Sequence, residues 1–178
     1  LRLGPEGAAL ANLVLGALDH ADCILTAEWS VRLAEALQTV AVLLTDQNLA
    51  QSRALIPAPA YRLPEIAPRL RAEPPQPVDP AMPYQRYAVT ASGVSPMAIP
   101  GTPSCTYGAE GLEHNERGKP SSAAADHQAQ LDKRLRKITG FDFGDGWADI
   151  RGAGATAILT WGSSTAAARE AAERLRAR

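Results

Sequence analysis

Residues 27–38 and 40–44, which read AEWSVRLAEALQ and VAVLL, set the fold class. In the first segment Trp29, Leu33 and Leu37 recur every four residues, and this spacing predicts an amphipathic helix. The second segment is a continuous apolar run rich in β-forming residues. Such a run, unlike an alternating one, is typical of a strand that is buried on both faces of a parallel sheet. Together the two segments predict an α/β fold in which helices flank a parallel sheet.

A polar segment, TDQN at residues 45–48, follows the apolar run. In open α/β sheets ligands gather at the carboxyl ends of the strands, which makes Asp46 a strand-end site candidate. Asp46 is also suited to cap a short helix over residues 47–53, and we favour this cap while keeping the site open. Upstream, residues 10–18 are apolar and fit either a strand or a helix.

Proline positions divide the chain into three parts. Twelve of the 14 prolines lie between Pro57 and Pro103, and most of that segment is therefore neither regular helix nor central strand. We expect an extended connector there that lies along a surface. The predicted division is residues 1–56, residues 57–150 with the connector, loops and a helix, and residues 151–178, the start of a second α/β domain.

Two loops follow the connector. Residues 87–90 predict a brief strand, and residues 91–103 form a Gly-, Ser- and Pro-rich loop of a length typical of functional or partner-contacting loops. A second, polar loop holds His114 between Glu113 and Glu116. A histidine between carboxylates can titrate near neutral pH, although a structural or interfacial hydrogen bond is the interpretation that we favour.

A helix is predicted to begin after Ser121 or Ser122 and to end before Gly140, a typical C-terminal stop. Its buried stripe is predicted to consist of Leu131, Leu135 and Ile138. Four basic residues crowd its last turns, namely Lys133, Arg134, Arg136 and Lys137. We interpret them as cations at the negative end of the helix dipole, with contact to an acidic partner surface as the alternative.

The last segment combines a strand, a turn and a helix. Residues 155–161 predict a buried strand, Gly162 a turn, and Ser163 or Ser164 the cap of a helix over residues 165–176. A helix N-terminus of this kind can hold an anion. The Gly-Ser-Ser turn matches neither a P-loop nor a dinucleotide fingerprint, so we interpret it as a structural turn.

The composition of the chain excludes several classes of function. Its 178 residues carry 18 Lys and Arg against 19 Asp and Glu, and this net charge of −1 argues against a nucleic-acid partner. No apolar run reaches the roughly 18 residues that a membrane span needs, and no secretory signal opens the chain, so we expect a cytoplasmic location. Cys23 and Cys105 are far apart and are interpreted as reduced thiols, and we predict no metal site.

The residues alone do not decide between an enzyme and an interaction or structural part of a larger enzyme. The chain contains no HExxH metal motif and no GxSxG nucleophile motif. It begins at Leu1 and ends at Arg178 inside a predicted helix, which we interpret as a piece of a longer protein.

Five segments, in order along the chain, are similar to motifs of the alpha subunits of 2-oxoacid:ferredoxin oxidoreductases. The similarity is greatest to the 2-oxoglutarate type. The segments are WSVRLAEALQTVAVLLTDQNLAQS (29–52), YQRYAVTASGVSPMAIPGTP (84–103), GLEHNERGKP (111–120), LDKRLRKI (131–138) and ILTWGSSTAAAREA (158–171).

This resemblance implies a fragment of the alpha subunit. Residues 1–56 would be the C-terminal part of the pyrimidine-side thiamine diphosphate-binding domain, and residues 151–178 the start of a transketolase C-terminal-like domain. The implied reaction is oxidative decarboxylation of a 2-oxoacid with coenzyme A as co-substrate, and the electrons pass singly to ferredoxin. Thiamine diphosphate would be shared with a beta subunit that carries magnesium and a [4Fe-4S] cluster. The family's pyrimidine-contacting glutamate has no matching segment here, so the catalytic residues are unknown and the fragment alone is expected to be inactive.

The resemblance also implies candidate site residues. The substrate or interface positions would be Thr90, Gly93, Ser95, Pro96 and His114. Three residues depart from the family pattern: Met97 stands where the family has Arg, Ala91 replaces an acidic residue, and Val40 replaces a Pro. Loss of a charge at Met97 bears on which substrate is bound, because Met cannot replace the guanidinium. The alternatives are a non-catalytic assembly module that docks a catalytic beta subunit, and an unrelated transketolase-like enzyme domain.

Overall fold

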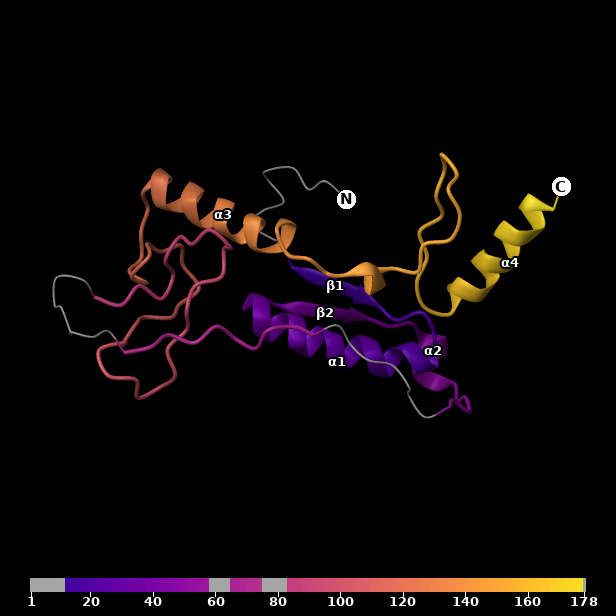
Figure 1. Ribbon diagram of the computed structural model, residues 1–178, viewed down its shortest axis with the longest axis horizontal. Helices are drawn as coiled ribbons and strands as arrows, with labels where there is room; N and C mark the ends of the chain where they lie inside the picture. The colour runs from indigo at the N-terminus through magenta and orange to yellow at the C-terminus, as the bar shows by residue number, and fades with distance from the viewer. Residues whose placement is uncertain (1–11, 58–64, 75–82, 178) are drawn as a thin grey trace. The chain divides into compact units, whose positions relative to one another are not determined.

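The computed structural model describes residues 12–57, 65–74 and 83–177 (Figure 1). The chain divides into two compact units. Of the described residues, the strand unit comprises 12–34, 39–57, 65–66 and 143–177, and the loop unit comprises 35–38, 67–74 and 83–142. The division into residues 1–56, 57–150 and 151–178 stays a prediction.

The strand unit contains a parallel pair of strands joined by a helix. β1 (Leu13–Gly16) pairs with β2 (Ala41–Leu44) in a register that sets Leu13 opposite Ala41. The connecting helix is α1 (His20–Leu37), which Figure 1 shows running along the strands. The predicted α/β class is confirmed, and the apolar segment 10–18 contains a strand within its described part.

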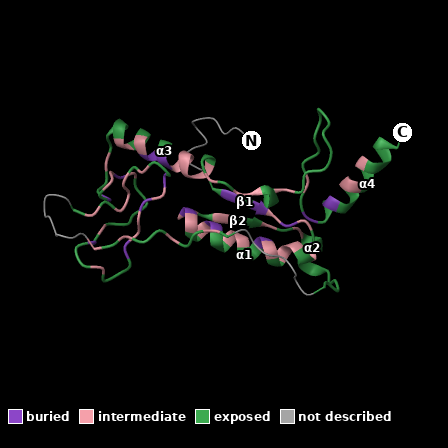
Figure 2. Cartoon of the chain, in the orientation of Figure 1, coloured by how far each residue is buried: buried purple, intermediate pink, exposed green. Residues whose placement is uncertain are grey.

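On the strands and α1, the buried apolar residues are Leu13 and Leu15 of β1 and Leu33 and Leu37 of α1. Leu33 and Leu37 on α1 are 1% and 2% exposed, whereas Val42 and Leu43 on β2 are 39% and 41% exposed. In Figure 2 β1 contains purple, buried positions, whereas β2 is pink and green. The expectation that this strand is buried on both faces is therefore wrong for this structure, because the described residues supply only two strands and no second layer.

The helix after β2 is α2 (Gln47–Gln51), and its cap is as predicted. The Asp46 carboxylate accepts a hydrogen bond of 2.9 Å from the Leu49 backbone N–H. The helix ends two residues earlier than expected, where the Ser52 N–H donates to the carbonyl of Asn48.

The predicted strand at residues 155–161 is wrong. This segment has no regular structure, and Ile158 and Leu159 are 63% and 91% exposed. An apolar run becomes a strand only when a neighbouring strand supplies its hydrogen bonds, and none of the described residues does so. The turn at Gly162 and the helix α4 (Ser164–Arg176) are confirmed, and a short 3-10 turn, η2 (Asp145–Trp147), precedes them.

In the loop unit the described part of the connector is extended, as predicted. Arg71 forms a parallel bridge with Met97. The Met97 N–H donates to the Leu70 carbonyl at 2.9 Å, and the Ala72 N–H donates to the Met97 carbonyl at 3.1 Å. Connector residues 70–72 therefore run along the later loop at Met97. Residues 58–64 and 75–82 lie outside the described residues.

The helix of the loop unit is α3 (Ala124–Thr139), with Gly140 as its C-cap. The predicted serine cap is not at the N-cap position, which Ala123 occupies. Ser121 accepts a hydrogen bond from the Ala123 N–H, at 3.3 Å, and donates to Asp126. None of the described helices is long and apolar enough to cross a membrane.

The predicted apolar stripe of this helix is also wrong. Leu131, Leu135 and Ile138 are half-buried, whereas Gln130 and Lys133 are 2% and 6% exposed. The face of α3 that is most buried is therefore polar, and its partners are the carbonyl groups of a loop.

Candidate functional site

Residues 87–97, which we call the clamped loop, are held by side chains of α3. Lys133 Nζ and Gln130 Nε2 donate to the Tyr87 carbonyl at 2.9 and 3.1 Å. An Arg136 guanidinium nitrogen donates to the Thr90 carbonyl at 3.0 Å. Buried carbonyl groups need hydrogen-bond partners, and here a helix supplies them in place of a neighbouring strand.

This arrangement explains why the predicted strand at residues 87–90 is wrong. The Tyr87 N–H donates to the Glu116 carbonyl at 2.9 Å, while the Val89 N–H donates to the Glu116 carboxylate at 2.7 Å. The donors and acceptors of the segment are thus satisfied by a second loop and by α3. No ladder forms within the part of the chain that the structure describes.

Hydrogen bonds within the loop unit fix the predicted site residues. Thr90 Oγ1 donates to the Val94 carbonyl at 3.0 Å, and Ser95 Oγ donates to the Ala88 carbonyl at 2.8 Å. Gln38 Nε2 donates to the Ser95 carbonyl at 2.9 Å. Ser95 is 2% exposed, so its hydroxyl holds the loop and does not face solvent.

Pro96 is held through its backbone by a tyrosine. Tyr84 Oη donates to the Pro96 carbonyl at 2.7 Å and accepts the Ala98 N–H at 2.9 Å. Burial raises the pKa of the Tyr84 hydroxyl, which keeps it a donor at neutral pH. The two hydrogen bonds bracket the end of the clamped loop.

Gly93 is the point of closest approach between the clamped loop and α3. Its φ is +79°, a conformation that favours glycine. A Cβ atom at this position would lie 2.5 Å from the Lys133 carbonyl oxygen and 2.7 Å from the Lys137 nitrogen. Gly93 is also a glycine in the family's loop motif, and the steric reason is that a side chain at this position would collide with α3.

A pocket of about 150 Å³ lies between the clamped loop and α3, and we call it the basic pocket. Four cationic side chains line it: Arg86, Lys133, Arg134 and Lys137. Three of the predicted site residues also line it: Gly93, Ser95 and His114. The structure therefore brings these three together, while Thr90 and Pro96 hold the loop that forms one wall.

The lysines of the basic pocket have lowered pKa values. Burial, followed by repulsion from Lys137 and Arg86, lowers the pKa of Lys133 from 10.5 to about 7. Burial, followed by repulsion from Arg86 and Arg134, lowers the pKa of Lys137 from 10.5 to about 8. Both shifts indicate that neither water nor nearby carboxylates fully stabilise the protonated forms of these two lysines.

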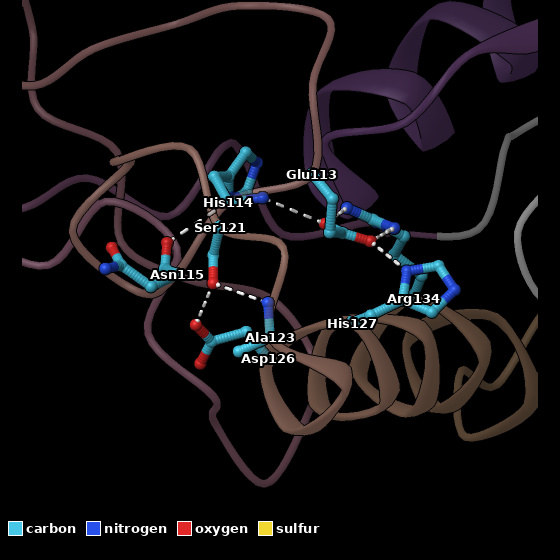
Figure 3. A network of polar contacts seen from close by, with 8 residues as sticks. All are labelled: Glu113, His114, Asn115, Ser121, Ala123, Asp126, His127 and Arg134. Carbon is cyan, nitrogen blue, oxygen red and sulfur yellow. Dashed lines mark hydrogen bonds and ion pairs between the residues drawn. The ribbon is translucent and has the colours of Figure 1, made fainter.

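Glu113 compensates one of the four cations (Figure 3). Its carboxylate accepts hydrogen bonds of 3.0 and 2.7 Å from Arg134 and one of 2.9 Å from His127. Burial alone would raise the pKa of Glu113, but the hydrogen bonds from Arg134 and His127 outweigh it and lower the pKa to about 2. Glu113 therefore stays ionised at neutral pH and pairs with Arg134.

His114 packs against an aromatic ring. It is 7% exposed, and the centroid of its ring lies 3.7 Å from that of Tyr87. Its Nδ1 lies 3.2 Å from the Asn115 carbonyl, while the Glu113 carboxylate faces α3 (Figure 3). The geometry matches the favoured interpretation of His114 as a residue with a structural hydrogen bond.

Asp46 lies in the strand unit, at a wide pocket of its own. Besides the Leu49 N–H, its carboxylate accepts the Ser163 N–H at 2.6 Å. These backbone hydrogen bonds, from Leu49 first and then Ser163, lower the pKa of Asp46. The anion bound at the Gly-Ser-Ser turn before α4 is thus the Asp46 carboxylate of this same chain. Asp46 therefore connects the start of α2 to the start of α4, and the sequence did not predict this connection.

Sequence reasoning missed Gln130, Arg86 and the role of the lysines on α3. A signal was present, because residues 130, 133, 134 and 137 follow the spacing of one helix face. All four of these residues are polar, and such a face indicates a polar partner and not an apolar core.

The chain is similar in sequence to several known proteins. No protein-family model matches it. The alpha subunit of 2-oxoacid:ferredoxin oxidoreductase 1 from Sulfurisphaera tokodaii is 32% identical over 174 residues, which is 91% of this chain and 26% of that protein. The 2-oxoglutarate oxidoreductase subunit KorA from Mycobacterium tuberculosis is 32% identical, covering 93% of this chain and 25% of that protein.

A solved structure agrees with these relatives. The 2-oxoglutarate:ferredoxin oxidoreductase from Magnetococcus marinus, with 2-oxoglutarate, coenzyme A and succinyl-CoA bound, matches with a TM-score of 0.68 and 34% identity. The match covers 93% of this chain and 28% of that one. By fold and sequence, the chain is similar to the 2-oxoacid:ferredoxin oxidoreductases. It is homologous to one segment of their alpha subunits, about a quarter of the length of these relatives, and the resemblance carried by the five motifs is confirmed.

Proposed function

We propose that the chain acts as part of the alpha subunit of a 2-oxoacid:ferredoxin oxidoreductase of the 2-oxoglutarate type. In the proposed reaction a 2-oxoacid is oxidatively decarboxylated in the presence of coenzyme A to an acyl-CoA, and ferredoxin takes up the electrons. The observation that carries this proposal is the 34% identity to an oxidoreductase structure that holds 2-oxoglutarate, coenzyme A and succinyl-CoA, over 93% of this chain. The expected location is the cytoplasm.

The proposal divides the cofactors between two subunits. Among the described residues no group of three or more His, Cys, Asp or Glu could hold a metal ion. Cys23 and Cys105 are free thiols. We therefore assign magnesium and the [4Fe-4S] cluster to a partner beta subunit, and thiamine diphosphate to a pocket shared with it. When bound, thiamine diphosphate supplies the electron sink for decarboxylation.

The part assigned to this chain is the positioning of the clamped loop. Thr90, Gly93, Ser95 and Pro96 are proposed as the positions that present this loop to substrate or to the partner subunit. The carbonyl groups of Thr90, Ser95 and Pro96 accept hydrogen bonds from the side chains of Arg136, Gln38 and Tyr84, respectively. A loop that is rigid before the ligand arrives loses little entropy on binding, which favours precise orientation of the substrate.

Met97 bears on the choice of substrate. Arg69 Nη1 lies 2.8 Å from the Met97 sulfur, and the same guanidinium is paired with Glu35 at 2.6 Å. A guanidinium therefore lies beside the position where the family has Arg, but its charge is neutralised by Glu35. We propose that the 2-oxoacid bound by this protein is held by cations other than a residue at position 97.

The remaining candidate positions have proposed structural roles. Asp46 is proposed as the residue that fixes the carboxyl end of β2 to the start of α4. His114 is proposed to hold Tyr87 in place at the wall of the basic pocket. We further propose residues 1–56 as the end of a thiamine diphosphate-binding domain, and residues 151–178 as the start of a transketolase C-terminal-like domain.

The test is an assay of the complex. The subunit that contains this chain is co-expressed with the beta subunit encoded beside it, and viologen reduction is measured with 2-oxoglutarate and coenzyme A. We expect reduction that requires both substrates. A well-folded complex that reduces viologen with none of a panel of 2-oxoacids would refute the proposal and favour a non-catalytic assembly module. Activity without an iron–sulfur partner would favour a transketolase-like enzyme.

A further inference from the structure

The basic pocket contains more positive charge than its surroundings compensate. Arg134 is paired with Glu113, but the ion pairs among the described residues include none to Arg86, Lys133 or Lys137. The acidic neighbour of Lys133 is Glu116, whose carboxylate is already hydrogen-bonded to the Val89 N–H.

Among the described residues, the hydrogen bonds of the two lysines leave some of their donors unused. Lys133 Nζ donates one hydrogen bond, to the Tyr87 carbonyl at 2.9 Å, and Lys137 Nζ donates one, to the Gln38 carbonyl at 3.0 Å. An ammonium group has three donor hydrogens, so each lysine can make further bonds. Arg86 lies over the rings of Tyr87 and Tyr107, 5.2 and 5.7 Å from their centroids.

The size of the pocket limits what it can hold. A volume of about 150 Å³ is well above the space that one water molecule needs. The pocket is therefore large enough for a compact anionic group. Lys133 is only 6% exposed, so an anion bound beside it is partly removed from water, where charge-assisted hydrogen bonds are strong.

We propose that the basic pocket binds a compact oxyanion, a phosphate or a carboxylate group, through Lys133, Lys137 and Arg86. The lowered pKa values of the two lysines support this proposal, because an anion would supply the compensation that burial removes. The inference concerns the chain itself and does not rest on the proposed oxidoreductase activity.

The test is calorimetric titration of the complete subunit that contains this chain, in its complex, at pH 7 and constant ionic strength. One arm uses inorganic phosphate and the other uses acetate, with chloride as the reference anion. We expect saturable binding at one site, with phosphate the tighter ligand because it carries more charge. Tighter binding of acetate would support a carboxylate site. Titrations with both anions that are indistinguishable from chloride would overturn the proposal.

Two variants test whether the anion binds in the basic pocket. Arg86→Gln removes a cation whose guanidinium donates none of the hydrogen bonds that hold the clamped loop, so the loop keeps its contacts. We expect it to weaken binding by about tenfold to a hundredfold, the usual effect of losing a hydrogen bond to a charged group. Arg117→Gln, an exposed residue outside the pocket, removes the same charge and is the control.

Nuclear magnetic resonance provides a second measurement. If the site is the basic pocket, phosphate shifts the amide resonance of Gly93, which lines it, and leaves that of Gly162 in the strand unit unchanged. Equal weakening of binding by Arg86→Gln and Arg117→Gln, or shifts at Gly162 and none at Gly93, would place the anion elsewhere and refute the proposal.

Discussion

Gly93→Ala tests whether the clamped loop depends on its close approach to α3. The added Cβ would lie 2.5 Å from the Lys133 carbonyl oxygen and 2.8 Å from the Lys137 Cβ. The first obstacle is helix backbone, which cannot rotate away as a flexible side chain could. Either the loop moves off α3 and loses its hydrogen bonds, or the last turns of α3 shift.

Two terms contribute to the expected loss of stability. A residue with a Cβ at a φ of +79° costs about 1–2 kcal/mol. Overpacking a filled site costs a further 1–3 kcal/mol or so, giving a total of about 2–5 kcal/mol. Gly101→Ala is the matched control, because Gly101 has a similar φ of +92° but nothing within 4 Å of the added Cβ. That control should show only the first term.

Urea unfolding followed by circular dichroism measures both variants against the unmodified chain. We expect Gly93→Ala to lower the free energy of unfolding by about 1–3 kcal/mol more than Gly101→Ala does, since only the first adds overpacking to strain. Equal losses for the two variants would show that the loop does not lie against α3 as the structure has it, and the argument for the basic pocket would fail with it.

Two further predictions concern titration. The pKa of Glu113 is lowered from 4.5 to about 2, so its ionised form stabilises the folded chain above pH 4.5, and this contribution disappears as pH falls towards 2. Glu113→Gln should therefore cost about 3 kcal/mol at pH 7 and much less near pH 2 in urea unfolding. For Lys133 the pKa is lowered from 10.5 to about 7, so the unfolded chain binds more protons between these values and stability should rise with pH. Lys133→Met should reduce that rise without removing all of it, because the pKa of Lys137 is also lowered, to about 8, and an undiminished rise in the variant would assign it to another group.

The elements that the sequence predicts correctly are those determined by local rules. The helix periodicity around Leu33, the capping carboxylate of Asp46 and the turn at Gly162 act within a few residues of chain. For the same reason α4 begins and ends within a residue of its expected bounds.

The two predicted strands that do not form have a different cause. Residues 87–90 and 155–161 have the composition of strands, but a strand exists only if another segment supplies its hydrogen bonds. For residues 87–90 that supply comes from Gln130 and Lys133, more than 40 residues further along the chain. For residues 155–161 no described segment supplies it, and their apolar side chains stay exposed.

The polar face of α3 shows why the candidate site was only half predicted. The motif resemblance selected Gly93 and Ser95 on the loop, whereas the cations opposite them were interpreted as a favourable charge at a helix end. A dipole interaction requires only that the charge lie near the last turn, and it leaves the side chain free to remain in water. Lys133 instead lies 6% exposed, with its ammonium on a loop carbonyl. Burying the ammonium group of a lysine costs more free energy than its interaction with a helix dipole supplies. Its position is therefore better explained by what the loop, and the anion that we propose beside it, require.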